Sequence, residues 1–71
     1  MQHPMKGDLI KGQSVLFGSQ ENNKIEQHNG LVVNKYILGG EILYEVVCED
    51  NIVRTFADYE ILEVINETRN N

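Results

Sequence analysis

The segment LVVNKYILGGEILYEVVCEDNIVRTFADYEILEVI, residues 31–65, decides the fold. It consists of short apolar runs separated by Gly39-Gly40 and by Glu49-Asp50-Asn51, and both separators suit the backbone angles of tight turns. Alternating runs joined by such turns are typical of a β-meander. Because so short a chain must curl its sheet to cover one face, the segment predicts an all-β fold.

Five strands are expected, and the third is the most regular. The strands are predicted at residues 13–17, 30–38, 41–48, 52–56 and 61–65, with one turn of 3₁₀ helix at 57–60. One set of alternate side chains in the third strand is apolar and should face the core: Ile42, Tyr44, Val46 and Cys48. The other set carries three carboxylates and should face solvent: Glu41, Leu43, Glu45, Val47 and Glu49.

The segment before the second strand has a different character. Residues 19–29 are polar apart from Ile25 and contain an Asn pair and an Asn-Gly step, which favour an exposed loop over the alternative, a short helical turn. Alternation in the second strand predicts two faces, one with Leu31, Val33 and Lys35 and the other with Val32, Asn34 and Tyr36.

Size and charge restrict the classes of function. The 71 residues suffice for one domain with a small core. The net charge of −5 is unevenly spread, with +1 in residues 1–40 and −6 in residues 41–71, which argues against binding to a phosphate backbone. Residues 1–12 lack the apolar run of a signal peptide, no stretch is expected to span a membrane, and Cys48 is the single cysteine. These features predict a cytoplasmic protein.

Five short motifs carry a resemblance to a known group of domains. They are Lys11-Gly12-Gln13-Ser14-Val15, Gly30-Leu31-Val32-Val33, Tyr44-Glu45-Val46, Arg54-Thr55-Phe56 and Glu60-Ile61-Leu62. Over about residues 10–65 this pattern resembles small SH3-like barrels of the Tudor-like or KOW-like kind, including Tudor-like domains appended to bacterial helicases and transcription-coupling factors. The resemblance implies an SH3-like barrel of five strands over residues 12–65. The polar residues at the two ends predict a flexible lead-in over 1–11 and a flexible tail over 66–71.

No constellation for catalysis, cofactor binding or metal binding is expected. Cys48 and His28 are the only conceivable nucleophile and base, and the place of Cys48 in the core-facing set indicates a small buried hydrophobe. Neither His3 nor His28 shows a metal-ligand spacing with Cys48. The pair Glu49-Asp50 is typical of an acidic turn. We therefore expect the protein not to be an enzyme.

Two sets of side chains are candidates for binding a partner. Phe17, Tyr36 and Tyr59 lie near strand ends, where they either close the barrel or form a cage for a cation beside Asp58. Leu43 and Val47 lie on the outer side of the third strand and suit a modest contact patch.

The sequence thus favours a small interaction module that binds a protein partner, accessory by resemblance to a nucleic-acid-handling or regulatory assembly in a bacterium or phage. The alternative is an acidic inhibitor that imitates nucleic acid through Glu41, Glu45 and Glu49. Direct nucleic-acid binding ranks third and would need four cations to gather on one side: Lys11, Lys24, Lys35 and Arg54. The oligomeric state stays open, because an exposed edge strand can pair with a second copy.

Overall fold

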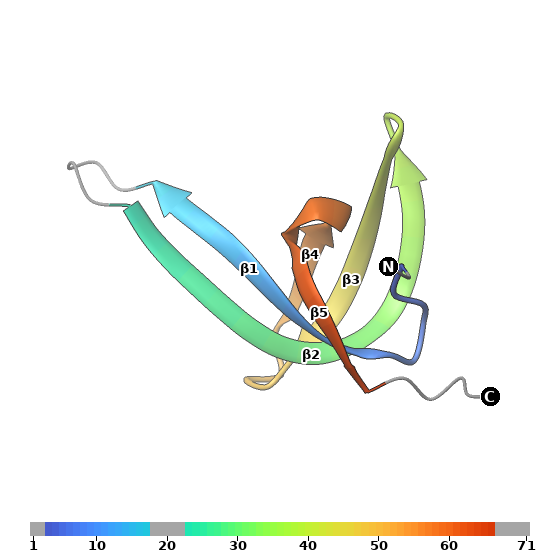
Figure 1. Cartoon of the computed structure of the whole chain (residues 1–71), viewed down its shortest axis with the longest axis horizontal. Helices are drawn as coiled ribbons and strands as arrows, with labels where there is room; N and C mark the ends of the chain where they lie inside the picture. The colour runs from blue at the N-terminus through green and yellow to red at the C-terminus, as the bar shows by residue number, and fades with distance from the viewer. Residues whose placement is uncertain (1–2, 18–22, 67–71) are drawn as a thin grey trace.

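The computed structural model describes residues 3–17 and 23–66, which form one antiparallel sheet (Figure 1). Its elements are β1 (Leu9–Phe17), β2 (Asn23–Leu38), β3 (Glu41–Cys48), β4 (Val53–Ala57), the 3₁₀ turn η1 (Asp58–Glu60) and β5 (Ile61–Asn66). The strand order is β4-β3-β2-β1-β5, so β4 and β5 form the two edges of an open sheet. The all-β prediction and the single 3₁₀ turn before the last strand are confirmed.

The two turns around β3 follow from their residues. Gly39 and Gly40 have φ angles of 59° and 82°, the left-handed values that a two-residue hairpin requires. After Cys48 the chain turns again, where the Asn51 N–H donates to the Cys48 carbonyl at 2.8 Å and Asn51 adopts a φ of 66°. Asparagine tolerates this region better than most side chains. The predicted bounds of β3 are therefore confirmed.

The core lies on the concave side of the curled sheet. Its cluster of buried side chains comes from four strands: Ile10, Val32, Tyr44, Val46, Cys48 and Phe56. The predicted core face of β3 is confirmed, with Ile42 partly buried beside the cluster. The sheet curls so far that the ring of Phe56 on β4 covers Gly12 on β1, where a Cβ would lie 2.9 Å from three ring atoms.

The first two strands are longer than predicted. The loop expected at residues 19–29 is wrong for residues 23–29, which belong to β2, whereas residues 18–22 lie outside the described residues. β1 likewise begins at Leu9, four residues before the predicted start at Gln13. Polar side chains do not prevent this pairing, because each of residues 23–31 lies opposite a residue of β1 in the antiparallel ladder. The Gln27 side-chain amide also donates to the Gln13 side-chain oxygen at 2.9 Å.

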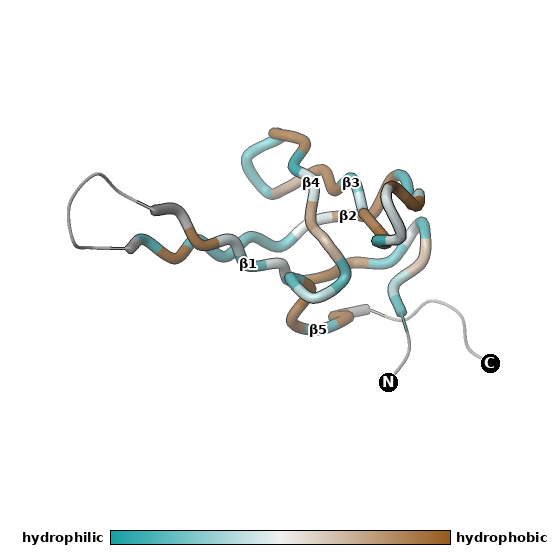
Figure 2. The backbone as a smooth tube through the Cα atoms, turned by 90° about the horizontal axis from the view of Figure 1, so that it is seen from above, coloured by the Kyte–Doolittle hydropathy of each residue, from teal (hydrophilic) through white to brown (hydrophobic). Residues whose placement is uncertain are grey.

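Part of this pairing extends beyond the body of the sheet. β5 pairs only with Leu9–Gly12, so residues 13–17 and 23–27 continue as a two-stranded ribbon. Figures 1 and 2 show the ribbon projecting away from the other strands. At the opposite end, the chain before β1 packs on β2, because the Gly7 N–H donates to the Val32 carbonyl at 2.8 Å. Pro4 and Asp8 are buried there, within the expected lead-in.

A β-bulge in β2 overturns both predicted faces. Val32 pairs with Val46 and Asn34 pairs with Glu45, so Val33 is an extra residue without a partner on β3. Directly opposed residues share a face, which places Val32 on the core side and Asn34 on the outer side. The prediction that Val32, Asn34 and Tyr36 share one face is therefore wrong. The prediction that Leu31, Val33 and Lys35 share the other face is wrong as well, because Leu31 lies opposite Val47 on the outer side and Lys35 lies opposite Tyr44 on the core side.

Candidate partner-binding surface

Four apolar side chains form a continuous row across the outer, convex face of the sheet. Strand pairing sets Leu9 opposite Leu31, Leu31 opposite Val47, and Val47 opposite Val53, so the row crosses β1, β2, β3 and β4. Leu9, Leu31 and Val53 are 37%, 41% and 56% exposed, and Val47 is half-buried between its two neighbours. We call Leu9, Leu31, Val47 and Val53 the outer row.

The outer row is bordered by polar side chains on its side toward the Gly39-Gly40 hairpin. The next opposed residues are Asn34, Glu45 and Thr55, and the Asn34 amide donates to a Glu45 carboxylate oxygen at 3.2 Å. A contiguous apolar strip with a polar border is the usual composition of a protein contact surface.

The predicted contact residues Leu43 and Val47 both lie on the outer face, but in different places. Val47 is in the outer row, whereas Leu43 lies beyond the polar border, opposite Tyr36 on β2. Leu43 and Tyr36 are both half-buried, and they form a smaller apolar pair at the hairpin end of the face. Leu9, Leu31 and Val53 were not predicted as contact residues.

Among the described residues, the side chains of the predicted aromatic cage do not lie together. Tyr59 is 77% exposed on η1 and borders three pockets, none of which Tyr36 lines. Asp58 is occupied, because one of its carboxylate oxygens lies 3.0 Å from His3 Nδ1 and accepts from the Tyr44 hydroxyl at 3.3 Å. The Phe17 side chain lies outside the described residues.

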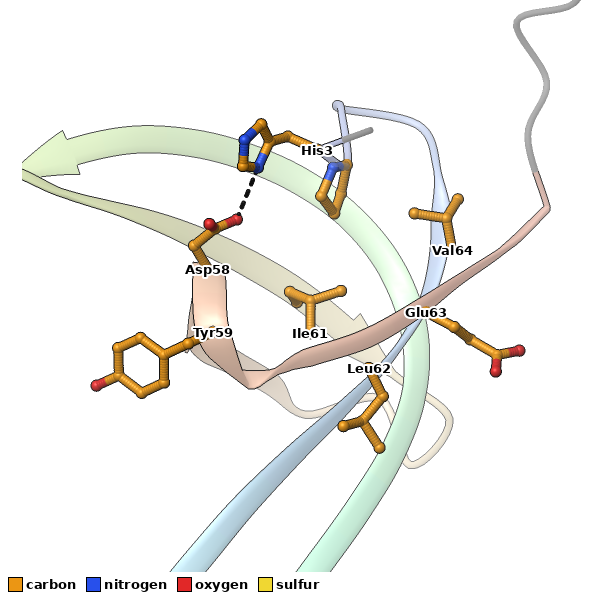
Figure 3. A pocket seen from close by; sticks show the side chains of 8 residues that line it. His3, Asp58, Tyr59, Ile61, Leu62, Glu63 and Val64 are labelled. Carbon is orange, nitrogen blue, oxygen red and sulfur yellow. Dashed lines mark hydrogen bonds and ion pairs between the residues drawn. The ribbon is translucent and has the colours of Figure 1, made fainter. Parts of the chain in front are cut away.

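A pocket of about 280 Å³ lies beside the edge strand β5 (Figure 3). It is lined by residues of the N-terminal segment, η1 and β5: His3, Pro4, Asp58, Tyr59, Ile61, Leu62, Glu63 and Val64. Figure 3 shows the His3–Asp58 bond across one side of the pocket and Tyr59 directed away from it. The pocket is thus lined along β5 by three apolar side chains and Glu63, and the His3–Asp58 pair lies on one side.

Contacts in two places shift the pKa values of ionisable side chains. Burial, with Asp58 as a second cause, raises the pKa of the Tyr44 hydroxyl to about 12. At the other end Arg54 donates to both Asp50 carboxylate oxygens at 2.9 Å, which lowers the pKa of Asp50 to about 2. The same contact raises the pKa of Arg54.

None of the described residues forms a helix that is long and apolar enough to cross a membrane. Comparisons with protein-family models, with curated proteins and with solved structures find no match to this chain.

Proposed function

We propose that this protein is a small non-enzymatic interaction module that binds a protein partner through the outer row. The observation that supports this proposal is the continuity of Leu9, Leu31, Val47 and Val53 across four strands on one face. Side chains that only shield the core would lie on the concave side, where the six residues of the buried core cluster already lie. An apolar protein surface on the partner would cover this row.

The energy available from the outer row alone is modest. Complete burial of a Val or Leu side chain contributes about 1.5–3 kcal/mol, and Leu9, Leu31 and Val53 are 37%, 41% and 56% exposed. These three side chains therefore offer about 2–4 kcal/mol before the costs of association, so further contacts are needed for stable binding. Backbone pairing at the free edge of β4, beside Val53, would add directed hydrogen bonds.

The proposal also includes the fold type. The strand order β4-β3-β2-β1-β5, the single 3₁₀ turn between β4 and β5, and the contact of Phe56 with Gly12 across the core support an SH3-like sheet of the Tudor-like kind. By that resemblance the module would be accessory to a nucleic-acid-handling or regulatory assembly in the cytoplasm. Because a fold alone does not determine a partner, the proposal of a protein partner rests on the outer row.

The test compares two variants that introduce the same charge on the same strand and face. Val53→Asp places a carboxylate in the outer row, and Thr55→Asp places one just outside it, at a side chain that is also exposed. Tagged wild-type protein and both variants are used to capture partners from a bacterial lysate, with low-salt and high-salt washes. Circular dichroism verifies that both variants fold.

The proposal predicts a partner that survives the high-salt wash on wild type and Thr55→Asp but is lost on Val53→Asp. Equal retention on all three proteins would contradict it. Capture of basic nucleic-acid-binding proteins that are released by salt would instead favour the acidic mimic, because exposed charge pairs are screened and apolar contacts are not.

A further inference from the structure

His28, Cys48 and Glu49 come together where the β1–β2 ribbon leaves the body of the sheet. Their nitrogen, sulfur and oxygen donors all lie within 4.8 Å of one another. The pairing of Gly30 with Cys48 sets β2 beside the end of β3, and the Glu49 N–H donates to the Asn29 carbonyl at 3.0 Å. The sequence spacing does not reveal this cluster, because it depends on the β2–β3 register.

We propose that these three side chains bind a zinc ion, with His28 Nδ1, Cys48 Sγ and a Glu49 carboxylate oxygen as ligands and water in the fourth position. The site is independent of the outer row.

The distance between the His28 and Glu49 donor atoms is compatible with tetrahedral zinc, and Cys48 Sγ lies within 4.8 Å of both. Bonds of 2.0–2.3 Å at tetrahedral angles separate neighbouring ligand atoms by about 3.3–3.6 Å. His28 Nδ1 lies 3.2 Å from Glu49 Oε2, close to that separation. Cys48 Sγ donates to the Val46 carbonyl at 3.7 Å, a long contact that a small rotation of the side chain would break.

The second nitrogen of His28 is held as in many zinc sites. Nε2 lies 3.3 Å from a Glu26 carboxylate oxygen, and the His28 side chain is only 14% exposed. A carboxylate that accepts a hydrogen bond from Nε2–H favours the tautomer whose Nδ1 can present its lone pair to a metal ion. Glu26 is therefore a positioning residue, which would orient the imidazole and increase its basicity.

The donor set favours zinc over magnesium or calcium. Thiolate and imidazole are ligands of Zn²⁺, whereas the hard cations prefer oxygen alone. The nearby cation Arg54 is paired with both carboxylate oxygens of Asp50 and also interacts with the Cys48 sulfur.

Zinc binding is a proton-releasing step. The Cys48 thiol loses its proton to solvent, its sulfur forms the bond to zinc, and a water that hydrated the ion is displaced. Calorimetry in two buffers with different ionisation enthalpies should therefore count about one proton released per zinc bound.

The test titrates the full chain with Zn²⁺ by calorimetry and with Co²⁺ by absorption spectroscopy. We expect one ion per chain, a Kd for Zn²⁺ of about 1 µM or below, and a thiolate-to-cobalt charge-transfer band. His28→Gln and Glu49→Gln should each weaken binding at least about tenfold, and Glu26→Gln should weaken it about tenfold. His3→Gln and Glu63→Gln are matched controls and should bind as wild type.

Cys48 is buried, so Cys48→Ser is interpreted only if its circular dichroism matches wild type. The charge-transfer band reports on the sulfur in the unmodified chain and replaces that variant if it fails to fold. Absence of binding, a cobalt spectrum without the band, or equal affinity in His28→Gln and wild type would each overturn the proposal.

Discussion

Gly30→Ala should abolish folding, because β2 and β3 approach each other too closely at this position for any side chain. A Cβ on Gly30 would lie 2.5 Å from the Val47 carbonyl oxygen and 3.0 Å from Cys48 Cα, and it would overlap Val46 Cγ1. Two of these three atoms belong to the backbone of β3, so a change of side-chain rotamer cannot relieve the overlap.

The expected cost follows from the two ways in which the chain can respond. Overpacking in a rigid core costs about 1–3 kcal/mol, and a partial separation of the strands that broke about two backbone hydrogen bonds would add about 1 kcal/mol for each. The sum, about 3–5 kcal/mol, matches the entire stability that a domain of this size usually has. Gly30→Ala should therefore be largely unfolded in buffer.

The assay is urea denaturation followed by circular dichroism, with Gly39→Ala as the matched control. Gly39 has a φ of 59° and open space around its Cβ position, so alanine there incurs only the backbone cost of about 1 kcal/mol. If the free energy of unfolding falls by about 1 kcal/mol per molar urea, the Gly39→Ala control should have a urea midpoint about 1 M below that of wild type. A cooperative transition in Gly30→Ala with a midpoint equal to that of Gly39→Ala would refute the close approach.

Three further predictions concern the second turn, the buried tyrosine and the outer row. Asn51→Val should lower the free energy of unfolding by about 1–2 kcal/mol, because a β-branched residue is strained at a φ of 66°, whereas an unchanged urea midpoint would contradict the turn geometry. Tyr44 should ionise near pH 12, as followed by tyrosinate absorbance in a pH titration. The Tyr44→Phe variant should lack this transition, which assigns it to Tyr44. A Tyr44 transition near pH 10 would show that the ring is solvated. The folded state retains this proton more strongly than the unfolded state, so the contribution of Tyr44 to stability should be complete below pH 10 and lost between about pH 10 and 12. Leu31→Asp should leave the fold intact, since Leu31 is 41% exposed, but should abolish capture of the partner; loss of cooperative unfolding would place Leu31 in the core instead.

The parts of the fold that depend on local chemistry could be predicted from the sequence. Gly39-Gly40 and Asn51 are turn residues, and the alternation between them leaves one register for β3, which the burial of Tyr44 and Val46 confirms. The single 3₁₀ turn before β5 also follows from a connection too short for a longer helix.

The bulge could not be predicted, and it changes the surface. The hairpin pairs Leu38 with Glu41, and an unbroken ladder would continue to Leu31 opposite Cys48, on the core side. The extra residue Val33 moves Leu31 opposite Val47 and so onto the outer face. Val33 is a β-branched residue like its neighbour Val32, and no glycine or proline marks the site. The outer row could therefore not be predicted from the sequence.

The β1–β2 ribbon was missed for a different reason. Residues 23–29 lack apolar alternation, the primary signal for a strand, and their backbone pairs because β1 lies beside them. The sequence therefore predicts His28 in a loop, away from Cys48. Pairing between distant segments, which a single sequence does not display, brings the two residues together.

The most direct test of the outer row is photocrosslinking in cells with a photoreactive amino acid placed at single positions. Val53 is the reporting position, and Lys24, which is exposed on the ribbon, is the control. We expect a discrete protein adduct from position 53, lost when Leu31→Asp is added, and no matching adduct from position 24. The same adduct from both positions, or one from position 24 alone, would contradict the claim that the outer row binds the partner.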